Sequence, residues 1–285
     1  MRVIGRLVSG LLLVGLLALI AYAVYQAATF NPGVNPPAVS EDFTDPSLSN
    51  WSLKLVDGNG DAAAPPYHGG DIRVENGTLR LQVSPDPDFS NESSTWQPGH
   101  PAAPQYNNAF AIGMPDFAPT REQKVVAGFQ MKIDTGYQGT SGLWIEARDT
   151  FDQQGVMLPG GFPGAIGVSF TSSESTQLLA GVRFEYVKGF IPLCLDNVGG
   201  VNPAVWNVYR IEWKKVWGFA DQFDLFVNGE HKAGCFIPLI CFRHSEIQIW
   251  SDNYKIGDLF QIGYLDPLKV QGTSYKELKI WAENK

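Results

Sequence analysis

Apolar and polar side chains alternate strictly over residues 208–213 and again over residues 223–227. Successive side chains of an extended strand point to opposite faces, so this period of two is typical of a strand with one buried face. Asn228 and Gly229 follow the second segment and supply the positive-φ residues of a tight hairpin turn. The apolar positions are Tyr209, Ile211, Trp213, Phe223, Leu225 and Val227. We therefore expect antiparallel strands here.

The same alternation recurs along most of the chain. Its apolar positions are Leu79, Leu81 and Val83; Phe129, Met131 and Ile133; Leu143, Ile145 and Ala147; Ile166, Val168 and Phe170; Val182, Phe184 and Tyr186; Ile247 and Ile249; and Leu278 and Ile280. No segment after the N-terminus has the 3.6-residue period of an amphipathic helix. Strands with one polar face each are buried most economically as two sheets packed face to face. The pattern therefore predicts an all-β, two-sheet antiparallel sandwich.

The N-terminal segment differs from the rest of the chain. Arg2 and Arg6 are the only charged residues before Glu41, and residues 7–30 form an uncharged, largely apolar run. Such a run suits a transmembrane helix, which needs about 20 apolar residues. The two arginines place the N-terminus in the cytoplasm. The alternative is a signal peptide that is cleaved after Ala-Tyr-Ala at residues 21–23, which would make the protein secreted.

These observations divide the chain into three parts. Residues 1–30 are expected to be a signal-anchor with one transmembrane helix, which tethers the protein to the membrane. Residues 31–40 contain three prolines without periodicity and predict a stiff spacer. Residues 41–285 continue without a low-complexity break and have a length that suits one all-β domain. With either N-terminal alternative, this domain lies outside the cytoplasm, in an extracellular or periplasmic compartment.

The net charge limits the partners of this domain. The chain has 21 basic and 29 acidic residues, which gives a net charge of −8. Two basic residues precede the domain, so 19 basic residues remain against 29 acidic ones, or about −10. A nucleic-acid partner requires a basic face, and this charge excludes one. It also argues against electrostatic docking on anionic lipid.

Cys194, Cys235 and Cys241 make an odd number of cysteines, so an oxidising compartment would leave one thiol free beside one bridge. Residues 190–194 (Phe-Ile-Pro-Leu-Cys) and 236–241 (Phe-Ile-Pro-Leu-Ile-Cys) echo each other. This echo favours neighbouring loops and a disulfide from Cys194 to either Cys235 or Cys241. A bridge between Cys235 and Cys241 stays open as the alternative. The cysteine and histidine spacings do not match a zinc site.

Four segments resemble concanavalin A-like lectin/glucanase domains. Residues 41–51 resemble their opening strand and turn, and residues 74–81 resemble the next strand with its Asn-Gly turn. Residues 206–229 resemble a strand pair that ends in an Asn-Gly hairpin. Residues 275–281 are similar to the closing strand, which pairs beside the first. The resemblance implies a jelly-roll sandwich, but this superfamily includes lectins, glycoside hydrolases and adhesion modules, so it does not decide the function.

Retaining glucanases of this superfamily carry Glu-x-Asp-x-Glu or Glu-x-Asp-x-x-Glu on one strand, and this chain lacks both motifs. Its nearest candidates are Glu146 and Asp149, which are three residues apart and therefore lie on opposite faces of a strand. Glu185 and Glu212 each stand alone in their strands and would pair only with carboxylates of other strands. We therefore expect no catalytic residues and a protein that is not an enzyme.

Aromatic side chains are the better candidates for ligand binding. Eight tryptophans and ten tyrosines in a weakly charged extracytoplasmic domain provide rings that can stack on sugars. Trp250 lies opposite the apolar side of its strand, and Trp217 lies between two predicted strands. The expected ligand-binding residues are Trp217, Trp250, Asp252, Asn253 and Tyr254. The alternative for any single tryptophan is packing in the core.

The resemblance also implies a structural calcium ion, because many relatives hold one between the first and last strands. The matching acidic positions in this chain are Glu41, Asp42 and Glu277. Carboxylate oxygens are the ligands that calcium prefers. The alternative is three solvated carboxylates near the ends of the domain.

The sequence leaves three functions to compare. The favoured one is a membrane-tethered, non-catalytic carbohydrate-binding or adhesion module whose partner is a glycan or a cell surface. The second is a divergent glycoside hydrolase whose carboxylates come from separate strands. The third is an accessory subunit of a membrane complex. Release of reducing sugar separates the first two, and co-purification with membrane proteins identifies the third.

Overall fold

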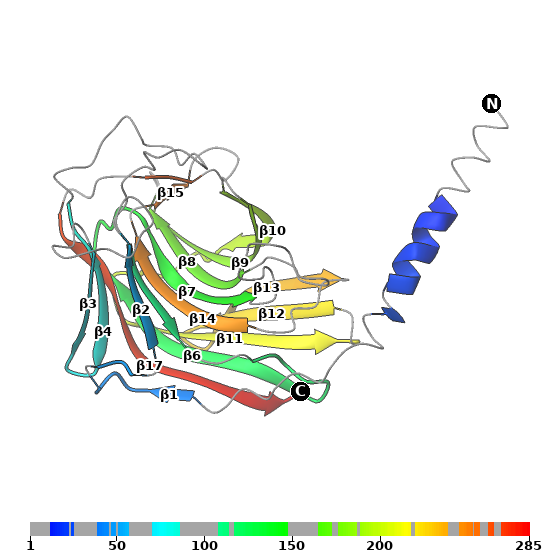
Figure 1. The fold of residues 1–285 in the computed structure, drawn as a ribbon, viewed down its shortest axis with the longest axis horizontal. Coiled ribbons are helices and arrows are strands. Elements are labelled where there is room, and N and C mark those ends of the chain that lie inside the picture. Colours follow the sequence, from blue (N-terminus) through cyan, green and yellow to red (C-terminus); the bar gives the residue numbers. More distant parts are fainter. Residues whose placement is uncertain are drawn as a thin grey trace.

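Two antiparallel sheets packed face to face make up most of the described structure, which is a computed structural model (Figure 1). It describes residues 12–22, 24–25, 39–45, 47–49, 51–56, 70–85, 108–113, 117–147, 165–172, 176–186, 189–217, 220–238, 245–252, 254–256, 262–264 and 269–285. The predicted all-β antiparallel sandwich is confirmed. We call the side of each sheet that faces the other sheet its inner face, and the opposite side its outer face.

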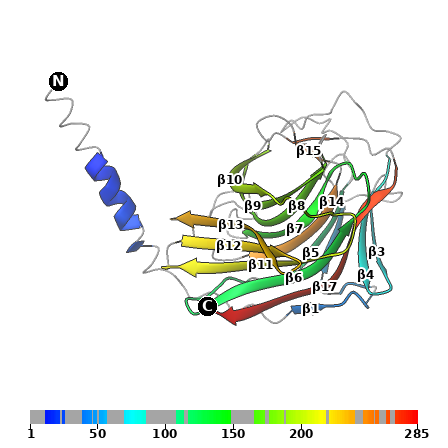
Figure 2. The ribbon, with the colours of Figure 1, turned by 180° about the vertical axis from the view of Figure 1, so that it is seen from behind.

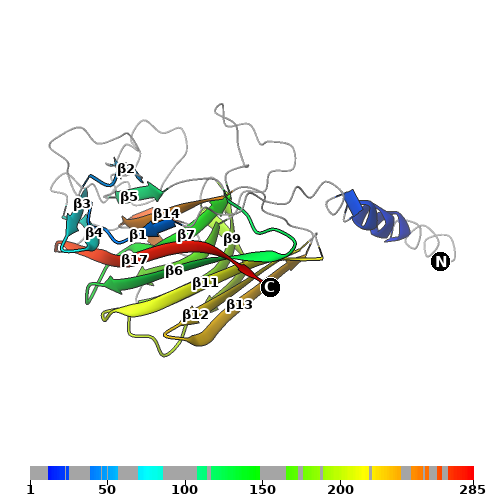
Figure 3. The same ribbon diagram turned by 90° about the horizontal axis from the view of Figure 1, so that it is seen from below.

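The larger sheet has eight strands, and its broad outer face is turned to the viewer in Figure 3. In spatial order its strands are β13 (Glu230–Pro238), β12 (Ala220–Val227), β11 (Asn207–Val216), β6 (Gln123–Ile133), β17 (Gln271–Asn284), β4 (Thr78–Val83) and β3 (Gly70–Glu75). The short strand β1 (Val39–Glu41) pairs with β17 beyond the end of β4. The first and last strands of the sandwich are therefore neighbours, as the sequence predicted.

The smaller sheet has seven strands and curves strongly, with its hollow side turned away from the larger sheet (Figure 1). In spatial order its strands are β10 (Gly189–Asn197), β9 (Thr176–Tyr186), β8 (Ala165–Ser172), β7 (Thr140–Ala147), β14 (Ser245–Asp252), β5 (Asn108–Gly113) and β2 (Trp51–Val56). A separate two-stranded pair consists of β15 (Tyr254–Ile256) and β16 (Ile262–Tyr264). The hollow side is thus the outer face of this sheet.

Turn residues set the register of the most regular hairpins. Asn228 and Gly229 have φ values of 52° and 83° and join β12 to β13. Asn76 and Gly77 have φ values of 51° and 69° and join β3 to β4. Both residues of a type I′ turn need positive φ, which asparagine and glycine adopt more readily than other residues. The Asn-Gly signals in the sequence therefore mark real hairpins.

The core lies between the inner faces and is built from the alternating apolar positions. The largest fully buried side chains include those of Trp213, Tyr209 and Phe129. Phe129 stacks on Tyr209 with ring centroids 5.2 Å apart, and Trp213 stacks on Phe223 at 5.8 Å. Each large apolar side chain buried in this way contributes roughly 1.5–3 kcal/mol. These aromatic pairs join neighbouring strands of the larger sheet, β6 to β11 and β11 to β12, and help to fill the core with their inner face.

One ion pair lies fully inside this core. Lys215 and Asp221 are directly opposed on β11 and β12, and their side chains are 1% and 0% exposed. The Lys215 ammonium lies 2.5 Å from a carboxylate oxygen of Asp221 and 5.1 Å from the centre of the Trp213 ring. Buried charges are costly unless they are paired. This hairpin therefore depends on both partners.

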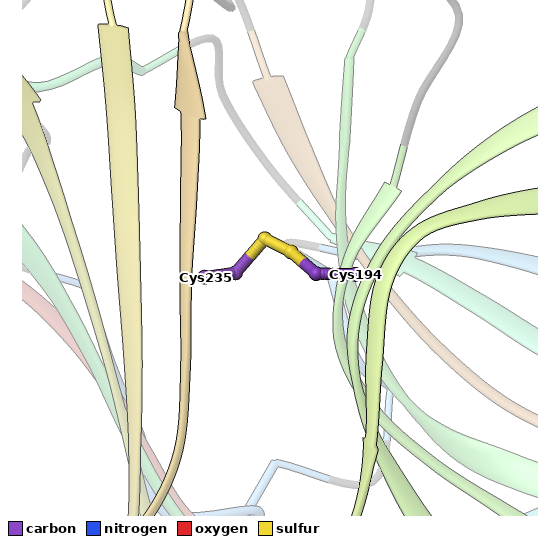
Figure 4. The surroundings of a disulfide bond; sticks show 2 residues. All are labelled: Cys194 and Cys235. Atoms are coloured by element: carbon purple, nitrogen blue, oxygen red, sulfur yellow. A yellow bond between two sulfur atoms is a disulfide. The ribbon is translucent and has the colours of Figure 1, made fainter.

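A disulfide joins the two sheets at one edge. Cys194 on β10 and Cys235 on β13 are bonded across the sandwich, with Cα atoms 6.0 Å apart and a sequence separation of 41 (Figure 4). The strands that they connect are the edge strands of their respective sheets (Figure 2). The structure thus selects one of the predicted pairings of Cys194. Cys241 lies outside the described residues.

Residues 12–22 and 24–25 are helical, and their large apolar side chains are exposed. Within the described ranges, no helix has the length and apolar character needed to cross a bilayer. The predicted span, residues 7–30, extends beyond this helix at both ends into residues that are not described. The first strand, β1, begins at Val39, two residues before the predicted start of the domain.

Candidate active site

The candidate site lies on the hollow outer face of the seven-stranded sheet. On β7 and β14 the inner positions are occupied by Leu143, Ile145, Ile247 and Ile249, all of which are buried. Because side chains alternate along a strand, the residues between them hold outer positions. The outer positions of β7 include Trp144 and Glu146, and those of β14 include Glu246, Gln248 and Trp250.

The register of β7 and β14 brings two glutamates together. Glu146 is the direct cross-strand partner of Glu246, and Trp144 is the partner of Gln248. Directly opposed residues of an antiparallel pair have Cβ atoms about 4.5–5.5 Å apart. Glycosidases with a catalytic carboxyl pair need the two groups on the same face and near each other. The register alone brings two glutamates to adjacent positions on neighbouring strands of one face.

The row that contains this pair continues across the sheet. Ala165 on β8 is opposite Glu146, and Arg183 on β9 is opposite Ala165. Strands are spaced about 4.8 Å apart, which places the Arg183 position about 10 Å from Glu146. Glu185 lies two residues further along β9 and therefore holds an outer position on the same face. The pair thus has a cationic residue in its row, two strands away.

The next row combines an aromatic residue with residues that lack side chains. Trp144 is opposite Gly167 on β8, and Gly167 is opposite Gly181 on β9. Neither glycine carries a side chain at its outer position. Sugar rings commonly stack on tryptophan side chains in glycan-binding sites. This row, which combines a tryptophan with two glycines, is the direct neighbour of the row that contains Glu146.

Hydrogen bonds that involve Trp250 connect β7 and β14, the two strands that carry the glutamates. The Trp250 indole N–H donates to the Thr140 hydroxyl at 3.1 Å, and the Ser141 hydroxyl donates to the Trp250 carbonyl at 2.9 Å. Tyr275 of β17 donates to the Gly142 carbonyl at 2.8 Å. All of these groups are buried, and buried polar groups that are fully bonded hold a site rigidly. The bonds fix β7, β14 and the larger sheet relative to one another.

The structure separates the aromatic residues that the sequence proposed for ligand binding. Trp250 is only 4% exposed, whereas Trp217 is 74% exposed at the end of β11 in the other sheet, where its ring lies 6.2 Å from that of Phe236. Asp252 ends β14 and Tyr254 begins β15, while Asn253 lies outside the described residues. The structure therefore does not gather these residues into one site, and their role in binding stays a prediction.

Two of the three acidic residues proposed for calcium accept hydrogen bonds from nearby groups. Glu41 accepts hydrogen bonds from the Phe43 amide at 2.9 Å and from the Trp51 indole at 3.3 Å. Hydrogen bonds from Thr44, chiefly from its hydroxyl, lower the pKa of the Asp42 carboxyl. Glu277 lies at a bulge of β17 and has a φ of 51°. Among the residues placed by the structure, no three acidic, histidine or cysteine side chains form a metal site. Calcium binding stays a prediction.

Glu212, a third carboxylate considered from the sequence, belongs to an ion network on the outer face of the larger sheet. Its carboxylate lies 2.6 Å from Lys124 and 2.7 Å from Arg210. Glu283 contacts the same two cations at 3.2 Å and 2.6 Å. The hydrogen bond from Arg210 is the main reason that the pKa of the Glu283 carboxyl falls to about 2. These carboxylates are neutralised by the two cations.

Sequence reasoning considered Glu146 but paired it with Asp149, and it missed Glu246. Alternation along β14 does assign Glu246 to the polar face, together with Gln248. The missing information was which strand lies beside β7. That neighbour is about 100 residues away in sequence and is fixed by tertiary pairing. A search for polar-face carboxylates on all strands would have included both glutamates.

Comparisons with known proteins support the fold. No family model and no curated protein matches the sequence. Among solved structures, the chain is similar to the kappa-carrageenase from Pseudoalteromonas carrageenovora, with a TM-score of 0.58 and 12% identity over 87% of this chain and 97% of that chain. It is also similar to the endo-beta-1,3-glucanase from Pyrococcus furiosus, with a TM-score of 0.55 and 13% identity over 87% and 94%. For the laminarinase catalytic domain from Thermotoga petrophila RKU-1, the TM-score is 0.54 at 14% identity over 88% and 100%.

These similarities confirm the concanavalin A-like lectin/glucanase fold that the sequence segments resembled. They also correct two expectations. The sequence favoured a non-catalytic binding or adhesion module and a protein that is not an enzyme. Both are contradicted, because the solved structures that are similar to this chain over most of its length include a kappa-carrageenase, endo-1,3-beta-glucanases and a lichenase. The interpretation of the sequence linked activity to a motif on one strand. It gave too little weight to carboxylates on neighbouring strands.

Proposed function

We propose that this protein is a glycoside hydrolase in which Glu146 and Glu246 form the carboxyl pair. The observation that carries the proposal is the register of β7 and β14, which makes these two residues direct cross-strand partners on the hollow face. The similarity to glycan-cleaving enzymes of this fold supports the same conclusion. The identities of 12–14% do not extend to residue roles, so these roles rest on the geometry alone.

The spacing of the pair favours a retaining reaction. One carboxylate attacks the anomeric carbon, while the other glutamate, in its protonated form, donates its proton to the oxygen of the leaving sugar. Water then attacks the glycosyl ester that has formed on the first glutamate. The second glutamate, now ionised, accepts a proton from this water, and the anomeric configuration is retained overall. The hydrogen bonds beneath β7 and β14 keep the two strands in register through both steps.

We infer that the substrate is a polysaccharide. The hollow face runs across seven strands, so it can contact several sugar units, and Trp144 beside two glycine positions offers a place for a ring. The similar solved structures include an endo-1,3-beta-glucanase and a kappa-carrageenase. Laminarin, a mixed-linked β-1,3-1,4-glucan and kappa-carrageenan are therefore the substrates to test first.

The experiment measures the reducing ends that the full-length protein, purified in detergent, releases from these three polysaccharides. We expect wild-type protein to cleave at least one of them. Glu146→Gln and Glu246→Gln should each lower the rate by about 10²–10⁴-fold, which is the usual loss when a positioned acid or base is removed. Glu185→Gln is the matched control, because it changes a glutamate on the same face that has no carboxylate partner in the register of β9 with β8 or β10.

Retention is tested separately by following the anomeric configuration of the first product with NMR. A retained product supports the close pair, whereas an inverted product would contradict it. Wild-type rates in both Glu146→Gln and Glu246→Gln would reject this pair, whatever activity the protein has. A wild-type protein that cleaves none of the polysaccharides would count against the proposed hydrolase.

We further propose that the sandwich functions outside the cytoplasm and is tethered by residues 7–30. The disulfide between Cys194 and Cys235 supports an oxidising compartment, since such bonds are rare in the cytosol. The uncharged apolar run supports the tether. If the tether is correct, the protein stays in the membrane fraction after a carbonate wash. A soluble mature form that begins at Val24 would instead identify a cleaved signal peptide. Membership of a membrane complex stays a prediction.

A further inference from the structure

The outer face of the larger sheet carries an aromatic ring flanked by two lysines. Trp206 directly precedes β11, and the pairing of Asn207 with Met131 continues to place Trp206 beside Lys132. The Lys276 ammonium lies 4.6 Å from the centre of the Trp206 ring, and the Lys132 ammonium lies 5.5 Å from it. Three segments that are far apart in sequence therefore meet at one ring on the outer face of the larger sheet.

Three other cations of the same face have carboxylate partners, whereas these two lysines have none among the described residues. Lys124 and Arg210 contact Glu212 and Glu283, and Arg80 is bound to Asp134. Within the described ranges, neither Lys132 nor Lys276 has a carboxylate at ion-pair distance, and the neighbouring Glu277 pairs with neither. A cation–π contact offsets only about 0.5–1 kcal/mol at an exposed site, and like charges repel each other. Two unpaired cations at one ring are therefore poised for an anion.

The backbone next to the ring is shaped locally. The register of β17 against β6 shifts between Lys276 and Lys279, and Glu277 adopts a φ of 51° inside this bulge. A β-bulge re-aims the side chains beside it, and bulges are enriched next to functional sites. Lys276 is the residue at the edge of this shift. The contact between Lys276 and Trp206 therefore lies at a bulge, which a regular antiparallel sheet lacks.

The surface beside the cations is apolar and partly exposed. Val205 and Val208 are 50% and 52% exposed, and Val208 is in one row with Gln130 and Lys276. The ligand that fits has three features. An anionic substituent pairs with the two ammonium groups, and hydroxyls form hydrogen bonds with the side-chain amide of Gln130. An apolar C–H face packs on the Trp206 ring and the two valines. An acidic sugar has all three. Nucleic acid needs many more cations than a chain of net charge −8 gathers here, and two lysines gain only about 2 kcal/mol from an anionic membrane.

We propose that Lys132, Trp206 and Lys276 form a binding site for an acidic sugar unit of a polysaccharide, one that bears a sulfate ester or a carboxylate. The site lies on the outer face of the eight-stranded sheet, whereas Glu146 and Glu246 lie on the outer face of the seven-stranded sheet. It binds the polysaccharide without cleaving it. The proposal does not depend on the proposed hydrolase activity, since it involves none of the residues of that site.

The test uses full-length protein carrying Glu146→Gln, so that cleavage does not disturb the titration. The probes are a kappa-carrageenan oligosaccharide, which carries sulfate, an oligogalacturonate, which carries carboxylate, and a neutral laminarin oligosaccharide. We expect Lys132→Met and Lys276→Met each to weaken binding of at least one acidic probe by about tenfold, as expected for the loss of a bond to a charged group. The acidic probe that responds identifies the anionic substituent. Lys279→Met is the matched control, because Lys279 lies on the same strand beyond the bulge, opposite Gly128.

A second measurement does not depend on how well the variants fold. Protein that carries only Glu146→Gln is acetylated with and without each probe, and the modification of every lysine is read by mass spectrometry. Protection of Lys132 and Lys276, with Lys279 unprotected, supports the site. Equal protection of all three lysines would overturn the site. It would also be overturned if Lys279→Met weakened binding as much as the other two lysine variants, or if those two variants weakened binding of the neutral probe as much as that of the acidic probes. Unchanged affinity in both lysine variants, or stronger protection by a single-stranded oligonucleotide than by any sugar, would also overturn it.

Discussion

Carboxylate residues on the outer faces of the two sheets have opposite kinds of charged neighbour. On the larger sheet, Glu212 and Glu283 are each bracketed by Lys124 and Arg210. On the smaller sheet, the register sets one glutamate directly against another, and the nearest basic residue of that row lies two strands away. Like charges that are directly opposed on a sheet are destabilising.

This difference separates charges that stabilise the fold from charges that are available for chemistry. The pKa of the Glu283 carboxyl is lowered to about 2, chiefly by the hydrogen bond from Arg210, so this group stays ionised. A glutamate next to another carboxylate has its pKa raised and can hold a proton at neutral pH, which a general acid requires. Substitutions on the two faces should therefore change different properties of the protein.

The largest expected effect is on cleavage. Glu146→Gln should reduce the rate on the best substrate by about 10³-fold, because it removes one of the two groups that the reaction needs. Its free energy of unfolding should not fall, since the change also removes a like-charge contact. Glu212→Gln on the other face should do the reverse and keep the rate while lowering stability. Rates and urea unfolding curves of the two variants check this pair, and a loss of stability in Glu146→Gln would break the comparison.

The next largest effect is on the core, at the hairpin of β11 and β12. Asp221→Asn leaves the Lys215 ammonium buried without its partner, and we expect a loss of roughly 3–5 kcal/mol in the free energy of unfolding. Urea unfolding measures this loss. The double variant Lys215→Met with Asp221→Leu removes both charges and should recover most of the stability. If the double variant is as unstable as the single one, the pair matters for its shape and not for its charge.

A smaller loss is expected when the link between the sheets is cut. Cys235→Ser removes the bridge to Cys194 and should lower stability by roughly 2–4 kcal/mol, because the bridge closes a long loop in the unfolded chain. Thermal unfolding with and without reductant measures it, and reductant should lower the melting temperature of the wild type but not that of Cys235→Ser. The control is Cys241→Ser. An equal loss in that variant would contradict the pairing of Cys194 with Cys235.

The smallest effect belongs to the surface network. Glu283→Gln should cost about 1 kcal/mol at neutral pH, since a partly exposed network is screened by solvent. The pKa of the Glu283 carboxyl is lower in the folded protein, about 2 against an ordinary 4.5, so its contribution is present above pH 4.5 and is lost as the pH falls towards 2. Unfolding curves from pH 7 to pH 2 should converge for wild type and variant. A constant difference across this range would contradict the assignment.

The sequence predicted the fold much better than the site. Strands such as β11 and β12 were predictable because their alternation and the Asn228-Gly229 turn are local signals. The pairing of Glu146 with Glu246 was not, since it depends on which strands become neighbours after β7 and β14 enter the same sheet. The choice of Cys235 over Cys241 depends on the same long-range arrangement.

The position of Trp250 shows a second limit of pattern reading. Alternation assigned it to the polar side of its strand, and its outer position agrees with this. Its side chain is nevertheless buried and its indole is bonded to Thr140, because an outer position on a strongly curved sheet does not guarantee contact with solvent. Exposure, unlike strand period, is a property of the finished tertiary structure.

The place of β17 in the larger sheet has a consequence for how the protein is made. This strand includes residues 271–284, the last strand described, yet it lies in the interior of the sheet between β6 and β4. Until the ribosome has produced it, β6 and β4 each have an edge with no partner from this sheet. Unpaired edges recruit other chains. Nascent or truncated chains that lack β17 should therefore depend on holding chaperones, and a premature stop before residue 271 should yield aggregates or degradation products.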